Sequence, residues 1–237
     1  MTGPESPAPA RLDRVLAQQL GCSRGEAQQY IEGGWVRMDG AVVEEPQAPV
    51  SDQRVELDDG ATLAPVEPGT ILFNKPAGLA TADAPGAIEA ATRWDGDATG
   101  IRLLKRHLRH LEPLAPLDRD ASGLLVLTQD GRVRRRLTED YASLEQEFVV
   151  EVEGRIADGG LQRLMQARGA QPACKVSWQN EFRLRFAIKN VRPGQLRDLC
   201  ATVGLRATAV RRLRIGRIAL SRMPEGAWRF LQVSERF

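Results

Sequence analysis

The sequence predicts an α+β protein in two parts, a small N-terminal module and a larger domain of buried strands and helices. Residues 11–59 pass from apolar positions at helical spacing to short alternating strands. Beyond residue 70, short apolar runs such as residues 71–73 and 124–127 are typical of strands that are buried on both faces. With 237 residues, the chain is long enough for two unequal domains.

The composition indicates a soluble, intracellular class of protein. Hydrophobic residues make up 42% and charged residues 27%, and no apolar run approaches the ~20 residues of a membrane span. Residues 1–10 lack the basic start and apolar centre of a signal peptide, so we expect a disordered lead-in there. The three cysteines are far apart and form no CxxC pair, which favours reduced thiols and a cytoplasmic location.

Metal and nucleotide cofactors are not expected. His107 and His110 are the two histidines of the chain, and their spacing places them on one helix face without a third ligand nearby. No P-loop and no glycine fingerprint follows a strand. The sequence therefore offers no motif for a nucleotide cofactor.

The charge is distributed unevenly along the chain. Residues 1–59 carry 5 Arg and 11 acidic residues, whereas residues 183–237 carry 12 Arg and 1 Lys against 3 acidic residues. The arginines cluster most tightly between Arg211 and Arg217. A cationic C-terminal part rich in arginine favours a polyanionic partner, and the alternative is a solvated basic face.

The first module has clear helix and strand signals. Residues 12–20 have helical spacing and Gly21 ends that helix. Ser23 and Glu26 have the spacing of a capping box for a second helix that reaches Ile31. Strands at 35–38, 41–43 and 54–57 follow, and Asp39-Gly40 between the first two is a hairpin signal.

This order resembles the S4 RNA-binding module, on the run Gly34-Trp35-Val36-Arg37-Met38-Asp39-Gly40 with Pro49-Val50 shortly after. We assign residues 11–59 to such a module. The resemblance implies RNA contacts from the two helices and the turn, through Arg11, Arg14, Ser23, Arg24 and Arg37. The net negative charge departs from this pattern and indicates weak or shape-based contacts. Asp13 is interpreted as a carboxylate stabilised by the helix dipole, without a catalytic role.

Residues 60–69 are predicted to be a linker, and residues 70–237 a second domain. Its first strand leads into Lys75-Pro76-Ala77-Gly78, and later comes the stretch Leu117-Asp118-Arg119-Asp120-Ala121-Ser122-Gly123-Leu124-Leu125-Val126-Leu127-Thr128-Gln129-Asp130-Gly131. Taken alone, this stretch is compatible with an ordinary polar loop before a core strand. Both motifs, in this order behind an S4 module, resemble the ribosomal RNA pseudouridine synthases.

Further segments extend the resemblance over residues 10–232. They are Glu145-Gln146-Glu147-Phe148-Val149-Val150-Glu151-Val152, Gln195-Leu196-Arg197-Asp198-Leu199 and Gly226-Ala227-Trp228-Arg229-Phe230-Leu231. Residues 174–176 and 182–188 are most similar to the S4-bearing branch that modifies large-subunit (23S) RNA. The resemblance implies a catalytic domain with a bent, mainly antiparallel mixed sheet flanked by helices.

The resemblance also implies that the chain isomerises a uridine within RNA to pseudouridine without a cofactor. Asp118 would be the catalytic carboxylate, acting either as a nucleophile or as a base. Arg197 would supply the cation that keeps Asp118 ionised, and Phe148 would stack on the flipped base. The family motifs and the arginine cluster add RNA-binding candidates: Lys75, Arg119, Gln195, Arg211, Arg212 and Arg214.

Four residues depart from the family pattern. Pro116 stands where the family has Arg, Ala121 where it has Thr or Ser, Gln146 where it has Lys, and Phe148 where it has Tyr. The alternative is therefore a catalytically weak or inactive RNA-binding descendant that acts in ribosome assembly. In either case we expect a monomer whose partner is ribosomal RNA or a ribosome assembly intermediate, with no membrane partner. The target uridine is left open.

Overall fold

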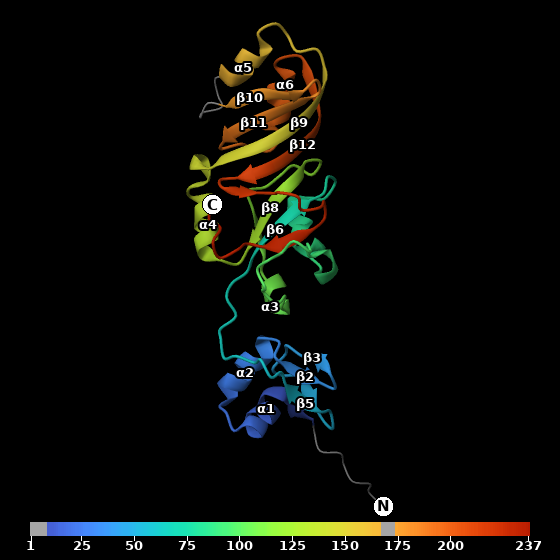
Figure 1. Cartoon of the computed structure of the whole chain (residues 1–237), viewed down its shortest axis with the longest axis vertical. Helices are drawn as coiled ribbons and strands as arrows, with labels where there is room; N and C mark the ends of the chain where they lie inside the picture. Colours follow the sequence, from blue (N-terminus) through green and yellow to red (C-terminus); the bar gives the residue numbers. More distant parts are fainter. Residues whose placement is uncertain (1–8, 167–173) are drawn as a thin grey trace, which may run out of the picture. The chain divides into compact units, whose positions relative to one another are not determined.

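The computed structural model describes residues 9–166 and 174–237, which fall into two compact units. The first unit comprises residues 1–67 and 102–109, and the second comprises residues 68–101 and 110–237 (Figure 1). Most of the predicted lead-in lies outside the described residues. Ala10, which the sequence assigned to that lead-in, pairs with Val50 in a short strand.

The elements follow each other in this order: β1 (Ala10–Arg11), α1 (Leu12–Leu20), α2 (Arg24–Glu32), β2 (Val36–Met38), β3 (Ala41–Val42), β4 (Pro49–Val50), β5 (Val55–Leu57), β6 (Thr70–Lys75), η1 (Thr81–Ala87), η2 (Ala90–Thr92), α3 (Lys105–Leu108), β7 (Glu112–Leu114), β8 (Ser122–Thr128), α4 (Gly131–Thr138), η3 (Tyr141–Ser143), β9 (Glu145–Gly154), α5 (Gly160–Gln166), β10 (Lys175–Asn180), β11 (Arg183–Lys189), α6 (Gln195–Ala201), β12 (Leu205–Ile215), β13 (Ile218–Ala219) and β14 (Trp228–Phe230). Residues 61–69, within the predicted linker, form neither helix nor strand.

The first unit is a helix pair packed beside a small sheet. The capping box at Ser23 and Glu26 is present at the start of α2, and Gly21 adopts a left-handed conformation at the end of α1. Strands β3, β2 and β5 form an antiparallel sheet, and apolar residues of both helices and the sheet make one core. The local signals of the sequence are therefore confirmed in this module.

Asp13 in α1 is fully buried and holds together the start of the first unit. It accepts hydrogen bonds from Arg11 at 2.8 Å, Arg24 at 3.2 Å and Gln28 at 2.9 Å. Burial alone would raise the pKa of this carboxyl, but the hydrogen bonds from these side chains outweigh it and lower the pKa below its usual range. Asp13 is thus structural, as expected, but direct ion pairs join the helix dipole in stabilising it.

Residues 102–109 pack with the first unit, although the sequence-based boundaries assigned them to the second domain. The Arg102 guanidinium lies 4.7 Å from the ring centroid of Trp35 and pairs with Asp58 at 3.4 Å. Arg106 pairs with Glu32 at 3.2 Å. This basic segment binds the acidic module because charges of opposite sign are complementary, a long-range match that local patterns do not reveal.

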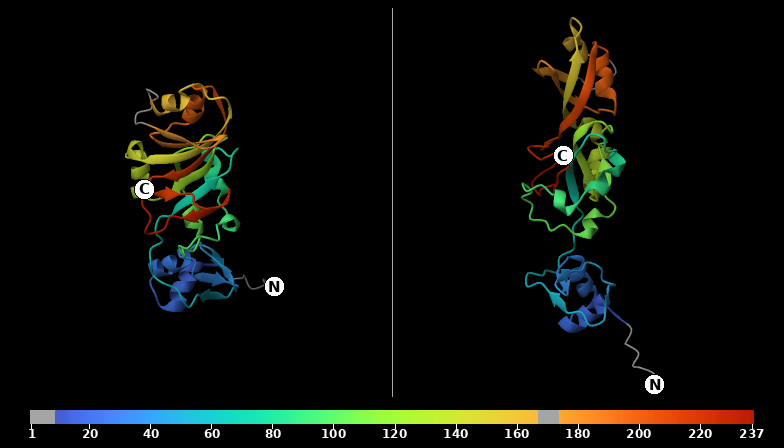
Figure 2. Two further views of the ribbon diagram at one scale, coloured as in Figure 1. Left: turned by 45° about the horizontal axis from the view of Figure 1, so that its top comes forward. Right: turned by 90° about the vertical axis from the view of Figure 1, so that its right-hand side faces the viewer.

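The second unit contains one large mixed sheet. Within the described residues, the strand order is β10-β11-β9-β12-β8-β6-β14, with β13 beside β12 and β7 beside β8 (Figures 1 and 2). Its neighbouring strands are antiparallel except β8 and β12, which are parallel. The predicted mixed, mainly antiparallel sheet is therefore confirmed.

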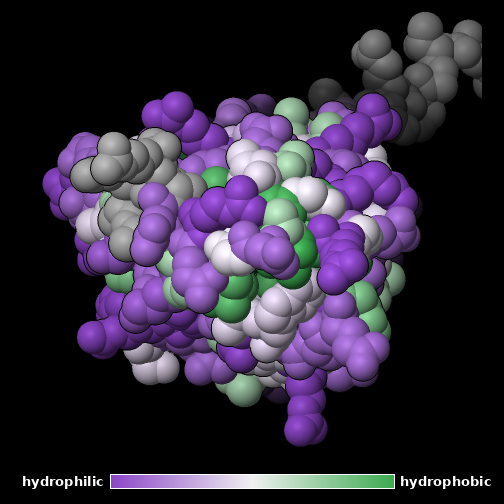
Figure 3. All heavy atoms as spheres, turned by 90° about the horizontal axis from the view of Figure 1, so that it is seen from above, coloured by the Kyte–Doolittle hydropathy of each residue, from purple (hydrophilic) through white to green (hydrophobic). Residues whose placement is uncertain are grey.

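Two apolar clusters cover different parts of this sheet. Helices α5 and α6 contribute Leu164 and Leu196 to the cluster over β9, β11 and β12, whereas α4 contributes Leu137 to the cluster beside β8. Strand β6 and residues 123–128 of β8 are buried throughout, as their apolar sequences predict. The surface at the α5 and α6 end is mostly hydrophilic, with apolar side chains visible near its centre (Figure 3).

The described residues contain no helix that is long and apolar enough to cross a lipid bilayer. In the same residues, no cluster of three or more His, Cys, Asp or Glu side chains has the arrangement of a metal site. Cys22, Cys174 and Cys200 are free thiols. Burial raises the pKa of Cys174 to about 12 and that of Cys200 to about 11, so both remain protonated at neutral pH.

We predict that Asp13→Asn lowers the free energy of unfolding by roughly 2 kcal/mol, because charge-assisted hydrogen bonds to a buried carboxylate are lost. Since folding lowers the pKa of Asp13, its contribution is complete above the ordinary value of 3.8 and declines as the pH falls toward the folded value. Urea unfolding at pH 7 and pH 3 measures both effects. Asp52→Asn, at an exposed position, is the control, and equal stability of the two variants would contradict the prediction.

Candidate active site

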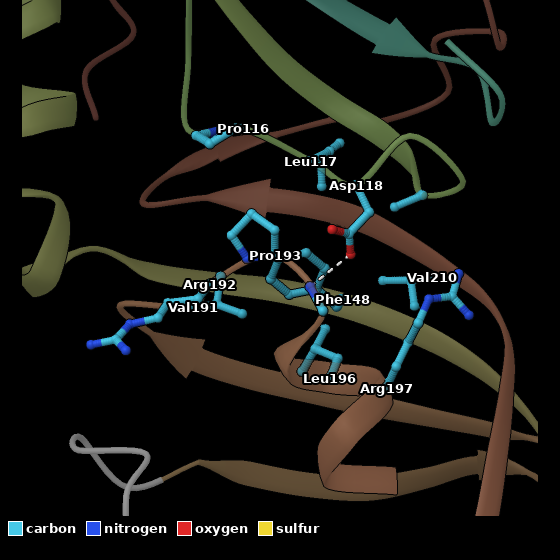
Figure 4. A pocket seen from close by; sticks show the side chains of 12 residues that line it. Pro116, Leu117, Asp118, Phe148, Val191, Arg192, Pro193, Leu196, Arg197 and Val210 are labelled. Carbon is cyan, nitrogen blue, oxygen red and sulfur yellow. Dashed lines mark hydrogen bonds between the residues drawn. The ribbon is translucent and has the colours of Figure 1, made fainter. Parts of the chain in front are cut away.

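Asp118 lies on the loop between β7 and β8, on the wall of a cleft with an empty volume of about 330 Å³, part of it open to solvent. Its Oδ2 accepts a hydrogen bond of 2.9 Å from the backbone N–H of Gly194 (Figure 4). Gly194 precedes α6 and has a φ of 79°, a left-handed conformation that glycine adopts without strain. The loop before α6 therefore fixes the direction of the Asp118 carboxylate.

Lys75 supports the Asp118 loop from within the fold. Its side chain is fully buried, and Nζ donates to the carbonyl oxygens of Pro76 at 2.9 Å, Leu79 at 2.7 Å and Arg119 at 3.1 Å. Burial lowers its pKa from the ordinary value. The RNA-binding role predicted for Lys75 is thus corrected to a structural one, because the amine has no exposed surface for a phosphate to contact.

Phe148 extends from β9 into the cleft and is almost completely buried. The guanidinium of Arg212 lies 5.9 Å from its ring centroid. Arg212 was predicted to contact RNA, but its side chain is fully buried and donates to the Leu124 carbonyl and other internal acceptors. It therefore lies inside the fold beside Phe148 and not on the surface.

Arg197 on α6, predicted to supply the cation that keeps Asp118 ionised, lines the same cleft and forms its ion pair with Asp120. Its Nη2 lies 2.6 Å from Oδ2 of Asp120, and Nη1 donates to the carbonyl of Ala207 at 2.8 Å. Asp118 instead receives the Gly194 N–H. The structure brings Asp118, Phe148 and Arg197 together at one cleft, and the ion pair that Arg197 forms is with Asp120.

The loop at residues 191–194 is the part of the cleft that sequence reasoning missed. It contributes Arg192, whose exposed side chain makes no ion pair with any described residue, and Gly194. Gln195, predicted to contact RNA, accepts a hydrogen bond from the Arg192 N–H and so braces this loop. The signal that could have found it is Pro193-Gly194, a turn dipeptide directly before the Gln195 motif.

The arginine cluster of β12 lies mostly outside the cleft. Arg211 is paired with Val149 and Arg212 with Phe148, so Arg211 is on the face of the sheet opposite to Phe148. Arg214 shares that opposite face, where it pairs with Glu145 at 2.7 Å and Glu147 at 3.1 Å.

The same glutamate-rich strand β9 neutralises further arginines. Arg183 pairs with Glu151 at 2.6 Å, Arg185 pairs with Glu147, and Arg206 pairs with Glu153. Four arginines of the basic C-terminal part are thus compensated by glutamates of the neighbouring strand β9. The alternation of Glu and apolar residues in β9 indicated a row of carboxylates on one face of the strand. The strand pairing was needed to show which arginines these carboxylates bind.

The remaining RNA-binding candidates are dispersed. In the first unit, Arg11 and Arg24 pair with Asp13, Arg37 pairs with Asp58, and Ser23 caps α2, whereas Arg14 is exposed without an ion pair to a described residue. Near the cleft, Arg119 is exposed, and its Nε donates to the Gly78 carbonyl at 2.9 Å. Arg119 therefore remains beside the Asp118 loop, available on the surface.

The arrangement suits chemistry on a planar group that enters the cleft. Among the described residues that line it, Asp118 is the one carboxylate, and its oxygen is oriented by a backbone donor. Phe148 and neighbouring apolar side chains provide a surface for a ring to pack against. Arg192 adds a positive charge to the residues that line the cleft, whereas the charge of Arg197 is paired with Asp120.

We predict that Gly123→Ala destabilises the second unit by at least about 2 kcal/mol. Gly123 has a φ of 107°, and an added Cβ would lie 2.2 Å from the carbonyl oxygen of Arg212 in the adjacent strand. Thermal and urea unfolding measure the loss. Gly131→Ala, at a helix start with open space around it, is the control and should be neutral or slightly stabilising. Equal stability of the two variants would show that the close approach of Gly123 to Arg212 leaves room for a Cβ.

Comparisons with known proteins match each of the two units to a known family. Residues 69–201 match the RNA pseudouridylate synthase family, and residues 10–55 match the S4 domain. The chain is 28% identical to the dual-specificity RNA pseudouridine synthase RluF of Salmonella typhi, over 95% of this chain and 76% of that protein. It is also 28% identical to the ribosomal small subunit pseudouridine synthase A of Salmonella typhimurium, over 89% and 90% respectively.

A solved structure described as a pseudouridylate synthase has the same fold. It aligns over 94% of this chain and 96% of its own with a TM-score of 0.58 and 21% identity. Since the family match covers more than half of the sequence, from the first strand of the large sheet to α6, the chain belongs to the RNA pseudouridylate synthases and carries an S4 domain before its synthase domain.

Proposed function

We propose that this chain isomerises a specific uridine in ribosomal RNA, in the large-subunit (23S) RNA, to pseudouridine, with Asp118 as the catalytic carboxylate. The N1–C1′ bond breaks, the uracil ring turns, and a C5–C1′ bond forms. C5 loses its proton and N1 gains one, so atoms and electrons balance without a redox partner. No cofactor takes part in this reaction scheme.

The observation that carries the proposal is the placement of Asp118 in the cleft, where Gly194 orients its carboxylate and Phe148 lines the facing wall. A uridine must leave its stack to reach such a carboxylate, which costs a few kcal/mol. Packing of the flipped base against Phe148 offsets part of that cost. The ionised carboxylate then acts on the sugar or the base, as nucleophile or as base.

The departures from the family pattern fit an active site in this chain. Phe148 keeps an aromatic surface in the cleft, and Gln146 accepts a hydrogen bond from the buried Arg212. Pro116 is exposed at the cleft, and Arg192, which also lines the cleft, supplies a cation there. These contacts favour a working synthase over an inactive RNA-binding descendant.

For the substrate and its setting, we infer ribosomal RNA, free or within an assembly intermediate, and a protein that acts as a cytoplasmic monomer. The resemblance of residues 174–176 and 182–188 to the branch that modifies large-subunit RNA supports the large-subunit assignment. We also infer a division of labour in which residues 11–59 assist RNA binding, residues 60–69 link, and residues 70–237 catalyse. The acidic character of the first unit assigns most of the RNA affinity to the second.

We predict that deleting this protein removes pseudouridine from one position of ribosomal RNA, as measured by carbodiimide-dependent primer extension or mass spectrometry. Wild-type protein should restore the mark and Asp118→Asn should not, because the amide can act neither as a nucleophile nor as a base of similar strength. The substituted side chain has nearly the same shape, so RNA affinity should change less than about threefold. An unchanged modification map would instead favour the RNA-binding descendant.

A second prediction concerns which arginines contact RNA. Arg192→Gln should weaken binding of the substrate RNA by about three- to tenfold and lower the salt dependence by about one counterion, because an unpaired cation beside the cleft is lost. Arg214→Gln should change affinity little, since Glu145 and Glu147 already neutralise Arg214 on the opposite face. Filter binding at several salt concentrations measures both variants. The reverse ranking would place the RNA on the other face of the sheet.

A further inference from the structure

Arg212, like Lys75, is a cation of the second unit whose whole side chain is buried and which forms no ion pair with a carboxylate of the described residues. Its guanidinium uses three different nitrogen atoms for three internal acceptors. Nε donates to the Leu124 carbonyl at 2.7 Å, Nη2 to the Ala115 carbonyl at 2.6 Å, and Nη1 to Oε1 of Gln146 at 3.2 Å. Burying a cation in this way is costly unless its donors are satisfied, which indicates a specific role.

Two of these acceptors bracket the loop that carries Asp118. Ala115 precedes the loop and Leu124 follows it in β8. Ala115 has a φ of 52°, a left-handed conformation that a non-glycine residue rarely adopts, so the bond to its carbonyl holds a strained position. A single planar guanidinium therefore fixes both ends of residues 115–124 relative to β12.

The third acceptor connects the same guanidinium to the strand of the aromatic wall. Gln146 and Phe148 lie on one face of β9, and the Arg212 guanidinium lies 5.9 Å from the Phe148 ring centroid. A lysine at position 146 would place a second cation against a buried one. Gln146 thus gives the Arg212 guanidinium an uncharged hydrogen-bond acceptor without adding a second positive charge.

We propose that Arg212 is a positioning residue of the cleft, whose guanidinium sets the distance between the Asp118 loop and Phe148. This inference rests on the proposed function, because it concerns the placement of a flipped uridine between the two. Displacement of reacting groups by about 1 Å can lower a rate by about 100-fold without a change in binding. Loss of Arg212 should accordingly affect the rate at saturating RNA far more than RNA affinity.

The test compares Arg212→Lys with Arg229→Lys in the full chain. Arg229 is the matched control, since it is also buried but pairs with Glu235 at 2.6 Å and lines no part of the cleft. Single-turnover pseudouridine formation at saturating RNA, RNA affinity and thermal unfolding are measured for both. We expect Arg212→Lys to slow the reaction by about 30-fold or more, with RNA affinity within about threefold of wild type and a stability loss similar to that of Arg229→Lys.

A rate for Arg212→Lys within about threefold of wild type, or an equal slowing by Arg229→Lys, would overturn the positioning role. If Arg212→Lys yields no folded protein, Gln146→Leu takes its place, because it removes only the bond to the strand of Phe148. The proposal then requires a loss of at least about threefold in rate, and an unchanged rate overturns it. No product from the wild-type protein would instead overturn the proposed function, and this inference with it.

Discussion

The close parallel contact between β8 and β12 is the constraint on which the rest of the synthase unit depends. It joins the strands β10, β11, β9 and β12 to the strands β8, β6 and β14 through pairing at Gly123 and Arg212. The backbones approach so closely that a Cβ on Gly123 has no space. The Asp118 loop enters β8 at this point and Phe148 lies on the strand next to β12, so the cleft lies where the two halves of the sheet meet.

Around this junction, the buried cations bind backbone carbonyl oxygens and are not exposed to bind a ligand. Lys75 and Arg212 each donate to carbonyl oxygens of the segments that carry Asp118, and both are shielded from solvent. Such bonds hold the Asp118 carboxylate in a defined direction, because the loop that bears it has little freedom left. The Gly194 N–H completes this support from the opposite wall.

Charged residues that form basic or acidic blocks in the sequence are brought next to residues of opposite charge in the structure. Glutamates of β9 pair with four of the twelve arginines in residues 183–237, and basic residues of the segment 102–109 pair with acidic residues of the S4 unit. Uncompensated cations are consequently few near the cleft, and among the described residues Arg192 and Arg119 are the exposed ones beside Asp118. Arg192 and Arg119 are therefore available to attract a polyanion beside Asp118.

The sequence by itself determined the helices, caps and buried strands, because these depend on spacing and on residues a few positions apart. The capping box at Ser23 and the apolar strand after Gly123 are examples, and the motif around Asp118 located the cleft. The tertiary structure decided the partners of the charged residues. It paired Arg197 with Asp120, buried Arg212 and placed Arg214 on the opposite face, because strand register and long-range packing, which no local pattern encodes, decide which side chains meet.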